Sequence, residues 1–394
     1  MDLKDLELLA PAGDLEGLTT ALKYGADAIY CGGPFMQLRA NSAAFTLEKL
    51  KKGAELVHAK GKKLYVTVNS FANNDEIPKL GSYAKELKEI GVDAVIVSDI
   101  GAISEIKEHC PELDVHVSTQ ANTMNYKSCE VYYNMGASRV VLARELDIDR
   151  IAEIRAKAPA KLELEAFVHG AMCMSYSGRC LLSAYLTGRS GNRGQCAQSC
   201  RWNYYLMEET RPGEFFKVEE SEHGSAILSS KELCAIEFLD KLAEAGVSSF
   251  KVEGRMRTPF YTATVINAYK MAMNKQYPID QLRAELDTVS HRPFTTGFYL
   301  KDPVALQPGD SGYVRDYLFV ATVVDKETIE TRNAFDLGDE LEVLSPGKLG
   351  RKFKLKYIIN DKGENIARSN TPMKLVKINL PEGVKPGDIL RKKC

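Results

Sequence analysis

Five cysteines gather in the middle of the chain, where their type and spacing could bind a metal centre. They are Cys173, Cys180, Cys196, Cys200 and Cys234, and the first four follow the spacing C-x6-C-x15-C-x3-C. Thiolate sulfur selects zinc, copper(I) or iron–sulfur clusters. Structural zinc sites favour pairs of close C-x2–4-C knuckles, and only one such pair is present. A [4Fe–4S] cluster accepts cysteines from scattered loops, so the spacing favours a cluster over zinc.

The charges around these cysteines also favour an iron–sulfur cluster. Between residues 166 and 207 there is no Asp or Glu, whereas there are four arginines, Arg179, Arg189, Arg193 and Arg201. A cluster with four thiolates is anionic, and arginines would offset its charge or hold an anionic substrate. The alternative is that the cysteines are reduced and buried, where they behave as small hydrophobic residues. No C-x3-C-x2-C triplet is present, so radical S-adenosylmethionine chemistry is not predicted.

A recurring pattern predicts the elements that would position these residues. Four times the amphipathic end of a helix is followed by a glycine and a short apolar run, at Gly25, Gly91, Gly136 and Gly246. The glycine suits the left-handed position that ends a helix. The apolar run is typical of a strand buried on both faces, as in a parallel sheet. About eight such units over residues 1–275 predict a (β/α)₈ barrel, with an open doubly wound sheet as the alternative.

In a barrel, the residues that follow each strand form the active-site face. Here that set is polar and varied, although each residue taken alone is more often a turn residue or a helix cap. It comprises Pro11, Ala12, Cys31 to Gly33, Asn69, Asp99, Thr119, Gln120, Arg144, Glu145, His169 and Glu253 to Arg255.

The last quarter of the chain has a different character. Short strand-like runs alternate there with turn signals such as Pro346-Gly347. We therefore expect a (β/α)₈ catalytic domain over residues 1–290, with a cysteine-rich insertion around 166–234, followed by a small β-barrel domain over 300–394. Residues 348–356 hold five cations and no acid. Such a run could follow a phosphate backbone or form an ordinary solvated strand face.

Composition excludes several classes of protein. Of 394 residues, 44% are hydrophobic and 27% are charged, which excludes a disordered or collagen-like chain. The net charge of −1 excludes a strongly basic coat for nucleic acid. No apolar run reaches the ~18 residues of a membrane span, and the charged N-terminus does not resemble a signal peptide. The odd count of nine cysteines argues against a disulfide framework. We expect a cytoplasmic protein that is not bound to a membrane.

Long motifs in the chain resemble the collagenase-like peptidase family. They are EAFVHGAMC at 165–173, SGRCLLS at 177–183, NRGQCAQSCR at 192–201 and SFKVEGR at 249–255. The likeness spans nearly the whole chain and is greatest to the prephenate-dependent tRNA uridine hydroxylases of that family. It implies a barrel with a β domain, tRNA as partner, and hydroxylation of the wobble uridine to 5-hydroxyuridine with prephenate as the oxygen source.

The resemblance also implies site residues. Related members hold a [4Fe–4S] cluster through four cysteines, and by motif position Cys173, Cys180, Cys196 and Cys234 match the ligands of one of them. Another relative uses both cysteines of the motif equivalent to Cys196 and Cys200, and we favour Cys234 over Cys200 as the fourth ligand.

Polar neighbours of the cysteines complete the predicted site. We expect Glu165 and His169 to be catalytic, and we expect four arginines to bind the anionic substrate, namely Arg179, Arg193, Arg201 and Arg255. Each arginine could instead pair with a rim acid such as Glu253. Trp202, Tyr204 and Tyr205 could stack on a base or pack in a core.

Two other functions remain open at this stage. A peptidase is one, because His169 lies four residues before Cys173 and a thiol nucleophile needs a nearby base. However, no oxyanion-hole motif is recognisable, and the H-E-x-x-H motif of metallopeptidases is absent. The other is a noncatalytic scaffold whose cluster is structural and which binds a protein partner of unknown identity.

Overall fold

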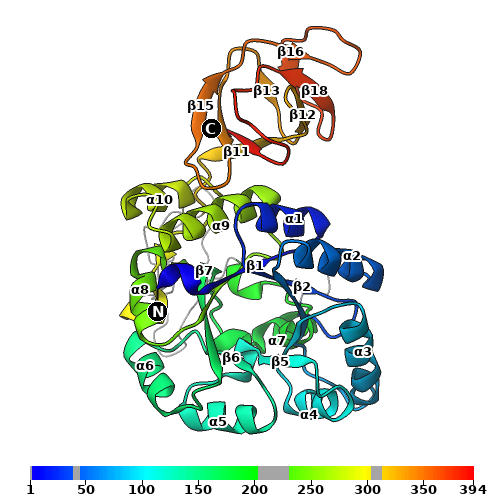
Figure 1. Cartoon of the computed structure of the whole chain (residues 1–394), viewed down its shortest axis with the longest axis vertical. Helices are drawn as coiled ribbons and strands as arrows, with labels where there is room; N and C mark the ends of the chain where they lie inside the picture. The colour runs from blue at the N-terminus through cyan, green and yellow to red at the C-terminus, as the bar shows by residue number, and fades with distance from the viewer. Residues whose placement is uncertain (1, 39–44, 203–229, 303–312) are drawn as a thin grey trace, which may run out of the picture.

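A computed structural model describes residues 2–38, 45–202, 230–302 and 313–394 of the chain. Its larger part is a closed barrel of eight parallel strands wrapped by helices (Figure 1). The strands are β1 (Glu7–Pro11), β2 (Ala28–Gly32), β3 (Lys63–Val68), β4 (Ala94–Val97), β5 (Asp114–Val117), β6 (Arg139–Val141), β7 (Glu163–Ala171) and β9 (Ser249–Val252). The barrel closes because β9 pairs in parallel with both β1 and β7. The predicted (β/α)₈ barrel is confirmed, and the open sheet is excluded.

The helices form an outer ring around the strands. They are α1 (Leu15–Lys23), α2 (Leu47–His58), α3 (Ile77–Glu89), α4 (Ile100–His109), α5 (Tyr126–Asn134), α6 (Ile148–Lys157), α8 (Leu239–Glu244), α9 (Pro259–Met273) and α10 (Ile279–Leu286). Side chains such as Asp14, Asp99 and Asp147 cap helix N-termini by accepting a backbone N–H three residues on. Gly25, Gly91, Gly136 and Gly246 all have φ above 90°, as the repeated pattern predicts. In the described ranges, no helix is both long and apolar enough to cross a membrane.

A long excursion interrupts the barrel after β7. The chain leaves the barrel at residue 172 and returns as β8 (Glu232–Cys234), which pairs antiparallel with β7 and carries β10 (Phe294–Thr295) on its other edge. The excursion contains the short helix α7 (Leu182–Thr187) and the four closely spaced cysteines. Tyr204 and Tyr205 lie outside the described residues.

The C-terminal domain is an antiparallel β half-barrel. Seven strands follow the order β15-β14-β19-β11-β12-β18-β16, and β13 (Phe335–Asp336) pairs separately with β17 (Arg368–Ser369). The seven are β11 (Tyr317–Val323), β12 (Thr328–Thr331), β14 (Glu340–Leu344), β15 (Arg351–Lys354), β16 (Ile358–Ile359), β18 (Leu375–Ile378) and β19 (Ile389–Lys393). Their apolar side chains, among them Val320, Ile329 and Leu341, form a separate core.

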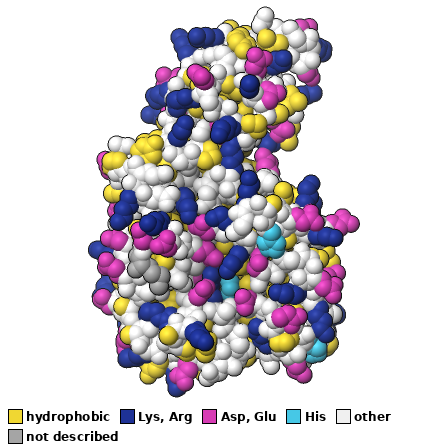
Figure 2. All heavy atoms as spheres, viewed as in Figure 1, with side chains coloured by type: hydrophobic (Ala, Val, Ile, Leu, Met, Phe, Trp, Pro, Cys, Tyr) yellow, Lys and Arg dark blue, Asp and Glu magenta, His cyan; other side chains and the backbone are white. Residues whose placement is uncertain are grey.

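The basic run at 348–356 lies mainly on an exposed strand of this domain. Arg351 and Lys352 are exposed, and Lys352 pairs with Glu340 on the neighbouring strand, with 2.8 Å between Nζ and Oε1. On the face shown in Figure 2, basic and acidic side chains are interspersed over this domain. These contacts favour a solvated strand face.

Polar contacts fasten the C-terminal domain to the outside of the barrel. Arg391 on β19 is 2% exposed, and its Nη1 lies 2.8 Å from Oε2 of Glu285 on α10, while its Nε donates to Glu342 Oε2 at 2.8 Å. Tyr24, at the end of α1, donates its hydroxyl to the carbonyl of Leu344 at 2.7 Å. The half-barrel therefore sits on the side formed by α1, α9 and α10, and the carboxyl ends of the barrel strands stay free for the excursion (Figure 1).

Candidate active site

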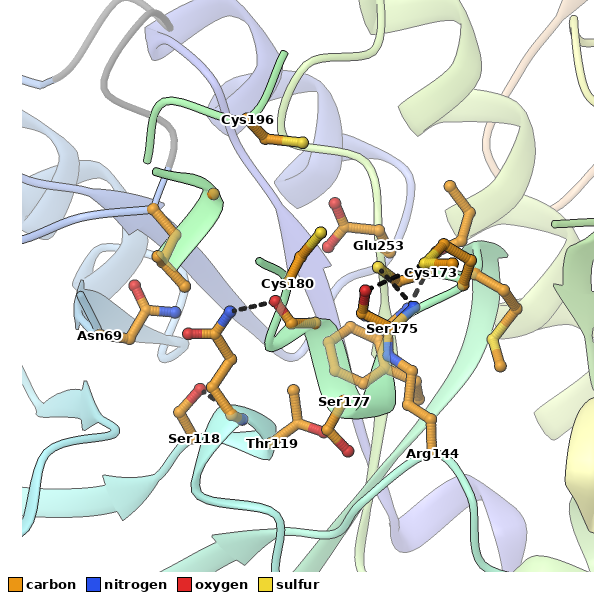
Figure 3. Close-up of a pocket in the computed structure, with 18 of the residues that line it drawn as sticks. Asn69, Ser118, Thr119, Arg144, Cys173, Ser175, Ser177, Cys180, Cys196 and Glu253 are labelled. Atoms are coloured by element: carbon orange, nitrogen blue, oxygen red, sulfur yellow. Dashed lines mark hydrogen bonds between the residues drawn. The ribbon is translucent and has the colours of Figure 1, made fainter. Parts of the chain in front are cut away.

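A cavity of about 210 Å³ lies at the carboxyl ends of the barrel strands, beneath the excursion. We call it the barrel cavity. Tyr30, Thr67 and Lys251 line it from the strands. Residues of the excursion, among them Cys173, Cys180 and Cys196, also line it (Figure 3). Barrel enzymes carry their active sites at this end of the fold. The excursion therefore covers the place where chemistry is expected.

Four of the five clustered cysteines line this cavity, namely Cys173, Cys180, Cys196 and Cys200. The Cβ atoms of Cys180 and Cys196 both lie 3.8 Å from the position that a Cβ on Gly191 would take. The sulfur atoms of Cys173 and Cys196 each accept a backbone N–H from the residue two positions on, at 3.4 Å. Figure 3 shows Cys173, Cys180 and Cys196 around the same opening. Cysteines that are far apart in the sequence therefore line one cavity.

The electrostatics of Cys200 place it in the same group. Burial raises the pKa of its thiol, Arg201 opposes this rise, and the nearby thiols of the other three cysteines add to it. Four thiols that line one cavity are suited to a cationic centre, because bound metal stabilises thiolates. The donor set therefore fits an iron–sulfur cluster.

Cys234, the expected fourth ligand, is the one clustered cysteine that does not line the barrel cavity. It is on β8, and it is 7% exposed. Its Sγ lies 3.9 Å from the hydroxyl of Tyr269 on α9, and burial raises the pKa of its thiol. The structure thus groups Cys200, rather than Cys234, with the other three cysteines.

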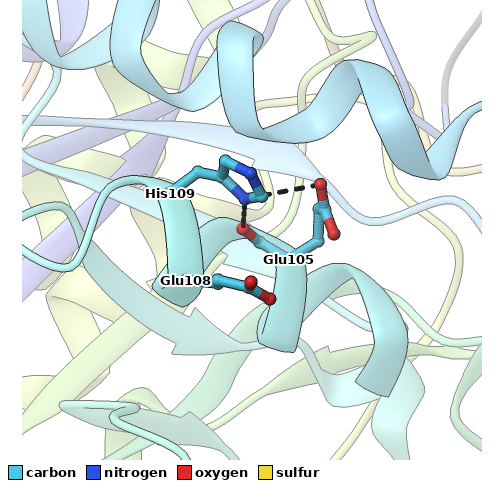
Figure 4. A group of neighbouring side chains, drawn as sticks. All are labelled: Glu105, Glu108 and His109. Atoms are coloured by element: carbon cyan, nitrogen blue, oxygen red, sulfur yellow. Dashed lines mark hydrogen bonds and ion pairs between the residues drawn. The ribbon is translucent and has the colours of Figure 1, made fainter.

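The four thiols are not arranged around one small ion. Among the described residues, the only group of three potential ligand atoms within 4.8 Å of one another is Glu105, Glu108 and His109 on α4 (Figure 4). That group lies on the barrel exterior, and His109 is already engaged by the Glu105 carbonyl at 3.0 Å. In a four-iron cluster each thiolate binds a different iron, so wider spacing of the sulfur atoms is expected.

Glu165 does not line the cavity but lies inside the barrel beneath it. It is 0% exposed, and its Oε1 accepts a hydrogen bond from Lys251 at 2.7 Å while its Oε2 accepts one from Arg139 at 3.0 Å. Burial favours the neutral carboxyl, but the two cations outweigh it and lower the pKa of Glu165. Glu165 is therefore an ionised group that positions Lys251, and the structure does not support direct contact with substrate.

His169 also points away from the cavity. It is 1% exposed, its Nδ1 is 3.2 Å from the hydroxyl of Tyr269, and its ring packs against Phe294. Burial holds its pKa well below the usual range, so the imidazole is neutral. In the described residues no hydrogen bond joins it to Cys173. The arrangement lacks the thiol–imidazole pair that a cysteine peptidase needs.

The predicted anion-binding arginines divide into two pairs. Arg201 and Arg255 line the cavity, whereas Arg179 and Arg193 do not. Arg193 forms a two-point ion pair with Glu76, with Nη2–Oε1 at 2.8 Å and Nη1–Oε2 at 2.9 Å. Arg179 donates from Nε to the carbonyl of Gln120 at 2.7 Å. These two arginines fasten the excursion to barrel loops, which is the alternative, structural role expected for them.

Arg255 is held at the base of the cavity by close packing. It is 7% exposed, and its Nη1 donates to Thr67 Oγ1 at 3.0 Å and to Gln37 Oε1 at 3.3 Å. A Cβ on Gly32, at the end of β2, would lie 2.6 Å from that Nη1. The absence of a side chain at Gly32 therefore makes room for the guanidinium.

Three further charged residues line the cavity beyond the site residues expected from the sequence. Lys251 lines its base, Arg144 lines its side, and Glu145 accepts the Ser177 hydroxyl at 2.6 Å. A signal for Lys251 was present, because a lysine within the apolar run of β9 must be buried with a partner. Arg144 lies on the predicted active-site face of the barrel, but its position in the sequence does not indicate what it contacts.

The fold and the site define a parallel-barrel protein with a thiol-lined cavity over the carboxyl ends of its strands. The chain belongs to peptidase family U32, whose model matches residues 13–307, and the model of the family's C-terminal domain matches residues 315–391.

Several curated relatives are similar over most of this chain. It is 36% identical to tRNA hydroxylation protein P1 of Bacillus subtilis, over 99% of this chain and 95% of the relative. It is 37% identical to tRNA hydroxylation protein P of Escherichia coli, over 91% and 90% of the two chains. It is also 37% identical to a protein of Porphyromonas gingivalis named collagenase, over 76% of this chain and 75% of that one.

Proposed function

We propose that this chain is an RNA-modifying enzyme that hydroxylates the wobble uridine of tRNA to 5-hydroxyuridine, with prephenate as the oxygen source and a [4Fe–4S] cluster in the barrel cavity. RNA hydroxylation is supported by two relatives named tRNA hydroxylation proteins that match nearly the full length of the chain. The observation that carries the cluster is the convergence of four thiols on one cavity.

The proposed cluster is held by Cys173, Cys180 and Cys196, with Cys200 as the fourth ligand in place of Cys234. Backbone N–H groups donate to the sulfur atoms of Cys173 and Cys196, and hydrogen bonds to the sulfurs are one of the means by which proteins tune a bound cluster. Arg201 lines the same cavity and adds positive charge. When bound, a cluster of this kind supplies one-electron redox chemistry beside the substrate.

The residues of the chain would present the base and exclude water from it. Enzymes that act on a base take it out of the stack, and an anticodon-loop uridine is already unpaired. Trp202 is 44% exposed and Tyr176 is 49% exposed, and both lie on the excursion that covers the cavity. Such aromatic side chains could stack on bases of the loop while the uracil enters the cavity.

Mass spectrometry of tRNA nucleosides tests this function. A strain that lacks the gene should lose 5-hydroxyuridine and its derivatives, and the wild-type gene should restore them. The Cys180→Ala variant should fail to restore them, whereas Cys394→Ser, which changes an exposed cysteine at the chain end, should succeed. An unchanged nucleoside profile in the deletion strain would overturn the proposal.

Hydrolysis of peptides receives no comparable support from the site. One relative is named collagenase, which is why peptide hydrolysis is considered as the alternative function. However, His169 is buried, neutral and outside the cavity that Cys173 lines, so no activated nucleophile is apparent among the described residues. Turnover of a peptide by an iron-free preparation would be the result that favours it.

A further inference from the structure

The short helix α7 has one side in the barrel cavity and another in solvent. Leu182 lines the cavity. In contrast, Leu181 is 78% exposed, Tyr185 is 87% exposed, and Leu186 is also exposed. We call these three exposed side chains, together with the exposed Arg189 that follows the helix, the α7 face. Neighbouring large apolar side chains in solvent mark a surface that binds a partner.

Short covalent and hydrogen-bonded connections tie α7 to two of the clustered cysteines. Cys180 immediately precedes the α7 face in the sequence. The Ser183 hydroxyl accepts the backbone N–H of Ala197, the residue after Cys196, at 3.0 Å. Asn192 accepts the backbone N–H of Cys180 at 3.2 Å and donates to its carbonyl at 3.2 Å. The α7 face is therefore the outer surface of the same structure that holds the cavity thiols.

The chain around the α7 face carries positive charge and no negative charge. From residue 166 to residue 207 there is no Lys, Asp or Glu, whereas there are four arginines. Among the described residues only the backbone of Arg189 is engaged, through its N–H to Thr187 Oγ1 at 3.3 Å and its carbonyl to the Ser183 hydroxyl at 2.7 Å. An acidic partner would meet this guanidinium without repulsion from a nearby carboxylate of the segment.

The composition of the α7 face indicates a protein partner rather than RNA. Protein interfaces are enriched in aromatic residues, Met and Arg and are depleted in Lys, Asp and Glu, as this segment is. Surfaces that bind nucleic acid are more polar and more basic. Leu181 and Leu186 offer neither a hydrogen-bond donor to a phosphate nor a ring to a base. Tyr176 and Trp202, which we propose to stack on bases, are not part of the α7 face.

The chemistry beneath α7 indicates what kind of protein would dock. An iron–sulfur cluster takes up electrons one at a time, and a protein carrier must come close to deliver them. Weak encounters between electron-transfer proteins bury less than about 1,200 Å², which suits a patch of three apolar side chains on one short helix. Opposite charges on the two surfaces would steer the encounter.

We propose that the α7 face is the docking surface for a small acidic iron–sulfur protein of the ferredoxin class, which passes one electron to the cluster of the barrel cavity. The carrier loses the electron and is oxidised, and the cluster gains it and is reduced from the 2+ to the 1+ state. No bond forms or breaks in this step, and no proton moves. The inference rests on the proposed function in one respect, since the electron acceptor is the proposed cluster.

Binding of an acidic [2Fe–2S] ferredoxin to the anaerobically purified full-length protein tests the docking surface, measured by calorimetry at low ionic strength. Tyr185→Ser and Leu181→Ser should each weaken binding by about 10-fold or more, because a few apolar anchors carry most of the energy of an interface. Arg189→Glu should weaken binding similarly and should reduce its dependence on salt.

Matched variants and a second measurement separate docking from folding. Val131→Ser removes an exposed apolar side chain from α5, and Arg150→Glu reverses an exposed charge on α6. Both should bind ferredoxin like wild type. In stopped-flow absorbance, reduced ferredoxin should bleach the cluster of Tyr185→Ser more slowly than that of wild type. Dithionite, a small reductant that needs no docking surface, should reduce both proteins at the same rate.

The outcomes distinguish this surface from the proposed function. If wild type holds no iron but Tyr185→Ser still binds ferredoxin less tightly, the docking surface stands and the proposed cluster is wrong. If Tyr185→Ser weakens binding of tRNA but not of ferredoxin, the α7 face contacts RNA and the inference is wrong. If wild type does not bind ferredoxin, or if Tyr185→Ser and Arg189→Glu bind it as tightly as wild type, the inference is overturned, while hydroxylation of tRNA can still be correct.

Discussion

Lys251 and Glu165 form a fully buried ion pair that connects the interior of the barrel to the base of its cavity, with 2.7 Å between Nζ and Oε1. The carboxylate is also shared with Arg139, which reaches the outer acids Glu7 and Glu163. Breaking a buried pair by removing one partner leaves an uncompensated charge. The charge that the cavity presents to a ligand is thus tied to the stability of the barrel.

Glu165→Gln should both destabilise the fold and weaken binding of prephenate, the proposed co-substrate. We expect a loss of about 3 kcal/mol in the free energy of unfolding, measured by denaturant titration, because two buried cations lose a shared partner. The control is Glu153→Gln, which breaks an exposed, solvent-screened pair with Lys157 on α6 and should leave stability nearly unchanged. Equal stability of the two variants would contradict the account.

The same pair predicts a pH dependence of stability. Lys251 and Arg139 hold the pKa of Glu165 below its reference value of 4.5, despite burial. The stabilisation is therefore complete above about pH 4.5 and is lost as pH falls through the folded-state pKa. The unfolding free energy of wild type should fall more steeply below pH 4.5 than that of Lys251→Met/Glu165→Gln. Parallel curves for the two proteins would show that the pair does not contribute.

Arg193 should fasten the excursion to the barrel through Glu76. Arg193→Gln removes both hydrogen bonds of that pair, so the excursion should open more often. We expect faster cleavage within residues 173–201 by limited proteolysis and faster loss of iron in air, with a change in global stability of about 1 kcal/mol or less. Arg189→Gln serves as control, and identical cleavage of both variants would argue against the role of Arg193.

Gly32→Ala should disturb the cavity without unfolding the barrel. The added Cβ would lie 2.6 Å from Arg255 Nη1 and would meet the amide end of Gln37, both of which are ends of flexible side chains. We expect several-fold weaker binding of prephenate, the proposed co-substrate, measured by calorimetry, with little change in melting temperature. Gly17→Ala on α1, where the new Cβ meets nothing closer than 3.4 Å, should bind like wild type.

The sequence predicts the barrel well because its pattern is local. Each of the four repeated glycines ends a helix at positive φ, and each is followed by a buried strand. The convergence of cysteines on one cavity is likewise predictable, because an insertion after a barrel strand must return to the same rim. The long-range pairing of Arg193 with Glu76 has no such local signal.

The positions of Glu165 and His169 show where the sequence pattern fails. Both lie on β7 with the same parity as Phe167, which lines the cavity. The pairing register of β7 with β9 shifts between Phe167 and His169, which marks a β-bulge or irregularity. Such a bulge reverses the side to which later residues point, so His169 turns out towards Tyr269. Cys234, which pairs with His169 across β7 and β8, is carried away from the cavity with it.

Iron and sulfide content of the anaerobically purified protein tests the central claim most directly. Wild type should contain close to four iron and four sulfide per chain, as a [4Fe–4S] cluster requires. Alanine at Cys173, Cys180, Cys196 or Cys200 should abolish the cluster, while Cys234→Ala and the buried control Cys110→Ala should retain it. Wild-type protein without iron, or full iron in Cys180→Ala, would contradict a cluster in the barrel cavity.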